Sequence, residues 1–201
     1  MSDHERRILS GSPIEIRRAA DDQSGPGIVR GYAAKFEVLS EPMWGFREQI
    51  ARGAFDGILE DDVRALFNHD PNHVLGRNGK TLRLSIDDTG LHYEVDLPDT
   101  QAARDLTVSI GRGDVSQSSF CFRVAPNGDT WDENEDGVII RTITRIGRLY
   151  DVSPVTYPAY PDATAGMRSL EAWKAGRNVA GGRARALRQS ASRRRTLDMI
   201  R

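Results

Sequence analysis

The strongest constraint on the fold is a pair of alternating segments between Thr81 and Leu97. Apolar side chains occupy every second position on both sides of a short polar stretch: Leu82, Leu84 and Ile86 before it, and Leu91, Tyr93, Val95 and Leu97 after it. The stretch between them, Asp87-Asp88-Thr89-Gly90, has the composition of a turn. Because the side chains of a strand alternate between its two faces, this pattern predicts a β-hairpin with one buried face.

Other short segments have the same strand character. We expect strands at 14–18, 28–38, 63–69, 118–124 and 138–155, an irregular segment at 41–50 and a turn at 70–72. We expect helices at 54–60, at 99–110 with Asp99 or Thr100 as cap and Gly111 as end, and in parts of 169–176 and 184–199. Many short strands with a few helices predict a mostly β fold with flanking helices (α+β), its sheet closed or half-closed.

The charge is unevenly distributed along the chain. The net charge is −1 at pH 7, but residues 168–201 carry +8 and the preceding 167 residues carry −9. We therefore expect a flexible arm at 1–12, a folded domain at 13–167, and a basic, partly helical or disordered tail at 168–201. Such a tail either stays solvated or binds an acidic protein surface or nucleic acid.

Three absences narrow the class of protein. The sequence has no run of about 18 apolar residues, so no transmembrane helix is expected. The first ten residues lack the apolar stretch of a secretory signal. The single cysteine, Cys121, cannot form an internal disulfide. These features favour a protein that works in a reducing interior without a membrane.

Three serines and the cysteine gather in the segment GDVSQSSFCF. If its second half is a strand, Ser118 shares one face with two phenylalanines and Ser119 shares the other face with Cys121. The phenylalanine face must be the core face, because burying each ring contributes about 1.5–3 kcal/mol. Ser119 is then the serine that a substrate could reach. Ser116 in the preceding loop and Cys121, which could also be a small buried residue, remain alternatives.

A nucleophilic serine needs a base, usually histidine. His69 ends a predicted strand, where a side chain can be held rigidly and still reach a cleft. Asp151 lies inside a strand-like segment, where an unpaired carboxylate would be costly, so it could orient the histidine. Alternatively, His69 is an ordinary turn residue bonded to Asp70, or Lys35 is the base of a serine–lysine dyad.

Two patterns resemble metal sites but depart from them. His69 and His73 have the spacing of a helical zinc pair, but Pro71 interrupts any helix there and the expected glutamate is absent. The acidic run 132–137 matches the first half of a calcium-binding loop, but the glutamate expected at position twelve is Ile143. We expect no metal and no other cofactor, and we interpret 132–137 as the tip of a hairpin.

Several motifs together resemble those of a known family. The main ones are LFNHD followed by VLGR, then RGDVSQSSF, then DVSPVTYPAYP, and GYA and GAFD add to them. Their order and spacing, over roughly residues 14–167, resemble the prohead serine protease of tailed bacteriophages. This resemblance implies a herpesvirus-protease-like β-barrel ringed by helices.

The resemblance also implies an activity. It implies a serine endopeptidase that cleaves scaffold segments of the major capsid protein inside assembling proheads in the host cytoplasm, and that often cleaves itself. The family's histidine and nucleophile fall on His69 and Ser119. Its acid falls on Asp151, where glutamate is commoner. Backbone N–H groups around 145–148 are candidates to stabilise the oxyanion.

The partners implied are the major capsid protein, its scaffold segment and further copies of this chain. No membrane partner is expected, and nucleic acid is expected only through the basic tail. A catalytically inactive assembly module of the same fold is the alternative function. The presence of both His69 and Ser119 favours the enzyme.

Overall fold

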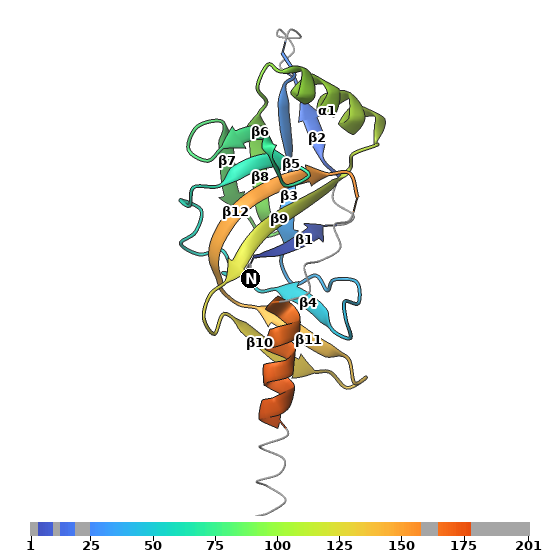
Figure 1. Cartoon of the computed structure of the whole chain (residues 1–201), viewed down its shortest axis with the longest axis vertical. Helices are drawn as coiled ribbons and strands as arrows, with labels where there is room; N and C mark the ends of the chain where they lie inside the picture. Colours follow the sequence, from blue (N-terminus) through green and yellow to red (C-terminus); the bar gives the residue numbers. More distant parts are fainter. Residues whose placement is uncertain (1–3, 10–12, 19–24, 158–164, 178–201) are drawn as a thin grey trace, which may run out of the picture. The chain divides into compact units, whose positions relative to one another are not determined.

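The computed structural model divides into two compact units, Met1–Ala163 and Thr164–Arg201. The residues that it describes are 4–9, 13–18, 25–157 and 165–177. In the second unit these form one helix over 165–177, which confirms the helix expected at 169–176 (Figure 1). The helix expected at 184–199, and the basic tail beyond residue 177, lie outside the described residues. No helix in the described parts of the chain is long and apolar enough to cross a membrane.

Within the described residues, the first unit has three sheets and one α-helix (Figure 1). The five-stranded sheet has the order β1 (Glu5–Leu9), β9 (Gln117–Val124), β12 (Ile146–Val155), β5 (Arg64–Phe67) and β6 (Asp70–Arg77). The four-stranded sheet has the order β2 (Glu15–Arg17), β3 (Ile28–Lys35), β8 (Gly90–Asp96) and β7 (Leu82–Ile86). The three-stranded sheet has the order β10 (Asp129–Glu133), β11 (Ile139–Ile143) and β4 (Arg47–Ile50), and the helix is α1 (Gln101–Arg112).

The mostly β class with flanking helices is confirmed, but the strands do not close into one barrel. Strands β1 and β6 are the two edges of the five-stranded sheet, and no pairing among the described strands joins them. The core forms instead where this sheet meets the four-stranded one, because the apolar faces of both belong to one buried cluster. Across this boundary, Tyr93 Oη and Ser118 Oγ are hydrogen-bonded at 2.8 Å.

The alternation in β9 places its side chains as predicted. Phe120 and Phe122 are buried in the core, with their rings stacked at 4.7 Å. Ser118 lies on the same face and is also buried. Its partner Tyr93 is fully enclosed, and burial raises the pKa of the Tyr93 hydroxyl, so this bond joins two neutral groups. Ser118 is therefore a core residue.

The hairpin between Thr81 and Leu97 is confirmed as β7 and β8. The side chain of Asp87 shapes its turn by accepting hydrogen bonds from the backbone N–H groups of Thr89 and Gly90, at 2.7 and 3.1 Å. A glycine is needed at position 90, because a Cβ there would come within 2.0 Å of the Ala34 carbonyl oxygen. The acidic run 132–137 also lies where predicted, at the connection between the antiparallel strands β10 and β11.

The helix expected at 99–110 is confirmed as α1. Thr100 is its N-cap, since the Thr100 side chain accepts a hydrogen bond from Ala103 N at 3.3 Å. The helix extends past Gly111 and ends at Gly113, whose φ of 84° suits a left-handed cap.

Two expectations about local structure were wrong. Residues 54–60 form consecutive turns instead of a helix. Gly53 and Gly57 have φ values of 81° and 78°, which an α-helix does not accommodate. The segment 41–50, expected to be irregular, contains strand β4, which pairs in parallel with β11.

The expectation of a loose arm at 1–12 was also wrong for Glu5–Leu9. These residues form the edge strand β1, antiparallel to β9. The inward positions of this strand carry charged side chains, because Glu5 and Arg7 are buried whereas Arg6 between them is exposed. Arg7 lies over the ring of Phe122, with its guanidinium carbon 5.6 Å from the ring centroid.

A cluster of buried charges joins β1 to the three-stranded sheet. Arg7 binds Glu48 of β4 through two hydrogen bonds, of 2.5 and 2.9 Å. Arg141 of β11 donates to Glu5 at 2.7 Å, to Glu48 at 2.9 Å and to Asp129 at 2.8 Å. The two arginines and the two glutamates are each at most 8% exposed, so these charges balance one another away from water.

This charge cluster predicts a loss of stability in acid. Burial alone would raise the pKa of Glu5, but hydrogen bonds and positive charge from Arg141 and Arg7 outweigh it and hold that pKa below its ordinary value of 4.5. A carboxyl whose pKa is lowered by folding stabilises the protein above its unfolded-state value and loses that contribution as the pH falls. We therefore expect the free energy of urea unfolding to decrease from about pH 4.5 downward.

The variant Glu5→Gln isolates this effect. At pH 7 it should be less stable by about 3 kcal/mol, because a buried arginine loses its charged partner. As the pH falls from about 5 to about 2, its stability should decrease less than that of the wild type, since the titrating group is gone. Glu15→Gln, which alters a largely exposed pair with Arg30, is the matched control and should behave as the wild type. Equal acid sensitivity of Glu5→Gln and the wild type would contradict the prediction.

Candidate active site

The candidate site begins at the tight turn between β5 and β6. Only Asn68 and His69 connect these strands, and their φ values are 54° and 57°. Positive φ at both central residues is the pattern of a type I′ hairpin turn, which matches the twist of the strands it joins. The turn expected at 70–72 therefore lies two residues earlier, and Asp70 is already the first residue of β6.

Asn68 fixes this turn against the end of β12. Its backbone N–H donates to the Pro154 carbonyl oxygen at 3.0 Å. Its side-chain amide donates to Thr156 Oγ1 at 3.1 Å and accepts from the Thr156 backbone N–H at 2.9 Å. Three hydrogen bonds thus hold the residue just before His69, so the direction of the imidazole is set by the neighbouring strand.

The structure brings together all three residues singled out from the sequence. His69 Nε2 lies 2.6 Å from Ser119 Oγ, and His69 Nδ1 lies 2.5 Å from Asp151 Oδ1. The exposed fractions of His69, Asp151 and Ser119 are 8, 6 and 0%. These contacts are consistent with Nδ1–H donating to the carboxylate while Nε2 accepts the serine O–H.

The sheet explains how residues far apart in sequence meet. Strand β12 lies between β9, which carries Ser119, and β5, which leads to the turn with His69. Ser119 points to the face opposite Ser118, as alternation predicts, but it is fully buried instead of open to a substrate. A side chain on the face opposite the core is therefore not necessarily exposed to solvent.

A fourth polar residue, Ser153, completes this group and was missed from the sequence. It is fully buried and pairs directly with Ser119 across β9 and β12. Its hydroxyl donates to Asp151 Oδ1 at 2.8 Å and lies 3.4 Å from His69 Nδ1. Its position two residues after Asp151, which puts both side chains on one face of the strand, is the signal that could have revealed it.

This arrangement has a definite chemical capacity. A serine hydroxyl hydrogen-bonded to an imidazole nitrogen can lose its proton as its oxygen attacks a carbonyl. A carboxylate on the other ring nitrogen keeps the imidazole in the tautomer that accepts this proton. The group of Ser119, His69 and Asp151 can therefore support acyl transfer.

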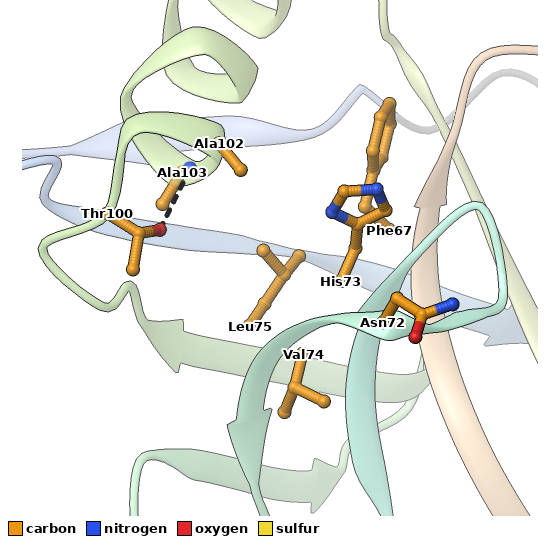
Figure 2. A pocket seen from close by; sticks show the side chains of 8 residues that line it. All are labelled: Phe67, Asn72, His73, Val74, Leu75, Thr100, Ala102 and Ala103. Atoms are coloured by element: carbon orange, nitrogen blue, oxygen red, sulfur yellow. Dashed lines mark hydrogen bonds between the residues drawn. The ribbon is translucent and has the colours of Figure 1, made fainter.

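A pocket of about 230 Å³ lies beside the same hairpin (Figure 2). It is lined by Phe67, Asn72, His73, Val74, Leu75, Thr100, Ala102 and Ala103. Figure 2 shows His73 and Phe67 among the side chains that line this pocket. The pocket thus opens between β6 and the start of α1.

His69 and His73, whose spacing resembles that of a helical zinc pair, have different partners in the structure. Both ring nitrogens of His69 are engaged by Ser119 and Asp151. His73 instead has its Nε2 3.9 Å from Asp70 Oδ2. A hydrogen bond from the Asn72 backbone N–H lowers the pKa of Asp70, so this partner is a carboxylate at neutral pH. No group of three or more potential metal ligands occurs in the described residues.

The other candidate nucleophiles and bases differ in position. Ser116 is exposed in the loop before β9. Cys121 is buried on the same face as Ser119, two positions along β9, where it pairs with Asp151. Lys35 lies at the end of β3 in the four-stranded sheet, paired with Gly90.

The segment 145–148 is not brought near Ser119. Ile146 pairs with Val124, and Arg148 pairs with Arg123. Arg123 is four positions along β9 from Ser119, which at about 3.3 Å per residue is roughly 13 Å. The structure therefore separates the suggested oxyanion donors from the serine.

Comparison with known proteins identifies the family. A family model described as caudovirus prohead serine protease matches residues 13–175. The chain belongs to this family. It is accordingly a protease of bacteriophage capsid maturation.

Two further comparisons complete the picture. Among curated proteins, no sequence matches the chain. Among solved structures, that of the bacteriophage T4 capsid assembly protease, gp21, is 13% identical with a TM-score of 0.40, and the match covers 76% of this chain and 99% of that one.

The first prediction for the site concerns Ser153. Replacing it in Ser153→Ala removes a hydrogen bond to the Asp151 carboxylate, and bonds to charged groups contribute about 1.5–3 kcal/mol. We expect kcat for peptide cleavage to fall about ten-fold or more with KM nearly unchanged, because Ser153 orients the group without lining an opening. Ser153→Thr keeps the hydroxyl and should restore part of the rate. A normal kcat in Ser153→Ala would contradict the prediction.

The second prediction concerns Asn68. Asn68→Gly tolerates the positive φ but loses both side-chain bonds to Thr156, so activity should fall while thermal stability changes little. Asn68→Ala loses the same bonds and also strains the backbone, so it should be less stable than Asn68→Gly by about 1 kcal/mol. Activity assays and thermal unfolding of the two variants separate these effects. Full activity in Asn68→Gly would show that the turn holds His69 without these bonds.

Proposed function

We propose that this protein is a serine endopeptidase in which Ser119 is the nucleophile, His69 the general base and Asp151 the residue that orients the histidine. The observation that carries the proposal is the continuous chain of hydrogen bonds from Asp151 through His69 to Ser119, at 2.5 and 2.6 Å. Such geometry, and not the order of residues in the sequence, defines this kind of catalytic group.

The mechanism follows from these contacts. Ser119 Oγ attacks the carbonyl carbon of the scissile peptide bond while its proton passes to His69 Nε2. The imidazolium then donates this proton to the departing amine nitrogen, which leaves an ester between the substrate and Ser119. Water, activated by His69, attacks the ester and releases the carboxylic acid product. Asp151 remains ionised and stabilises the positive charge of His69 in both steps.

We further propose that the substrates are the scaffold segments of the major capsid protein and, by self-cleavage, this chain itself. The proposal rests on membership of a family of prohead proteases, whose members act during capsid assembly. The cleavage would take place inside the assembling prohead, in the host cytoplasm. The partners are then the capsid protein and its scaffold segment.

Cleavage of co-expressed capsid protein tests the proposal. Ser119→Ala and His69→Ala should each reduce the rate of cleavage by about 10³-fold or more, because the members of such a group act as a unit. Intact-mass spectrometry of the capsid protein and of the protease itself would measure both products, in the presence and absence of a chelator.

Ser116→Ala is the matched control, since this serine is exposed outside the group. It should cleave like the wild type, and the chelator should have no effect. Persistent cleavage in Ser119→Ala would overturn the assignment of the nucleophile and direct attention to Cys121.

A further inference from the structure

Ser119 is fully buried, although a carbonyl carbon must come within about 3–3.5 Å of its Oγ before a bond can form. On one side of Ser119 lies β12, whose Ser153 is the direct cross-strand partner of Ser119. On the same side, hydrogen bonds hold Asp151 to Ser153 and to His69. The strand on the other side is β1, at the edge of the sheet. The side chain of β1 that lies beside Ser119 therefore affects how a substrate reaches Ser119 Oγ.

The register of β1 identifies that side chain as Ile8. Ile8 is the direct antiparallel partner of Ser119, and Leu9 is the partner of Ser118. Directly paired residues point to the same face, with their Cβ atoms about 4.5–5.5 Å apart. Ile8 therefore lies on the face of Ser119, whereas Leu9 lies on the core face with Ser118.

The buried charges hold Ile8 in this position. Arg7, the preceding residue, is fixed to Glu48 by two hydrogen bonds, and Glu5 is fixed to Arg141. Ile8 points away from these charges and is itself only partly buried. Its β-branched side chain has few rotamers, and the strand that carries it is held by the buried charges. Ile8 is therefore a rigid side chain on an anchored strand.

We propose that Ile8 limits access to Ser119 and so determines how bulky a substrate group is accepted beside the scissile peptide bond, on the side of β1. This inference rests on the proposed function, because it takes Ser119 as the nucleophile. It gives the N-terminal strand, which contributes none of the three proposed catalytic residues, a role in selecting the peptide substrate.

The reaction of Ser119 with organophosphorus inhibitors tests this role without knowledge of the natural cleavage site. In the reaction with diisopropyl fluorophosphate, Ser119 Oγ bonds to phosphorus, fluoride leaves and the hydroxyl proton passes to His69. We expect Ile8→Ala to react about ten-fold faster than the wild type and Ile8→Phe to react more slowly by a similar factor. With a bulkier diphenyl phosphonate, the gain in Ile8→Ala should be larger still.

Leu9→Ala is the matched control, because Leu9 is on the same strand but faces the core. It should react at the wild-type rate with both probes, as measured by intact mass at a temperature where all variants are folded. Equal rates for Ile8→Ala, Ile8→Phe and the wild type would overturn the inference while leaving the proposed function intact. Absence of labelling at Ser119 in every folded variant would overturn the proposed function, and the inference with it.

Discussion

The insertion of β12 between β9 and β5 is the constraint on which the candidate site depends. Neighbouring strands lie about 4.8 Å apart, so β9, which carries Ser119, and β5, which leads to His69, are about 9.6 Å apart across β12. An imidazole can bridge that gap only if it extends over the intervening strand. Strand β12 stabilises this bridge, because Asp151 accepts a hydrogen bond from the imidazole and the Pro154 carbonyl oxygen accepts one from the Asn68 backbone N–H.

The parts of this site that were predicted follow from simple burial arguments. Alternation separated Ser118 from Ser119 because two phenylalanines mark the core face of β9. The expense of an unpaired carboxylate in a strand drew attention to Asp151, and the structure pairs it with His69. The total burial of Ser119 was not predictable, since it depends on two neighbouring strands and a turn that approach from distant parts of the chain.

The features that were missed share a physical cause. The turn was placed at Pro71 because proline and its polar neighbours are common turn residues, whereas two consecutive non-glycine residues at positive φ leave little trace in a sequence. Strand β1 was missed because its inward side chains are charged. Glu5 is buried against Arg7, two residues away, and against Arg141, which is 136 positions away, so a local window of sequence contains only part of the information.

The buried charge cluster shows that an interaction can specify the register of a strand without giving the greatest stability. Apolar side chains of similar size would often stabilise such a position as well or better. Charged partners, however, favour one register of β1, because a shift that put Arg6 in place of Arg7 would also put His4 in place of Glu5 and remove a carboxylate partner of Arg141. The cluster thus defines the alignment of β1 with β9, and with it the identity of the residue opposite Ser119.

The order of the strands also has a consequence for synthesis of the protein on the ribosome. His69 and Ser119 both leave the ribosome before β12, yet β12 is the strand that lies between them. A nascent chain that stops short of residue 146 contains both side chains but cannot hold them at bonding distance. The proposed chemistry therefore requires a chain that has been synthesised at least through β12.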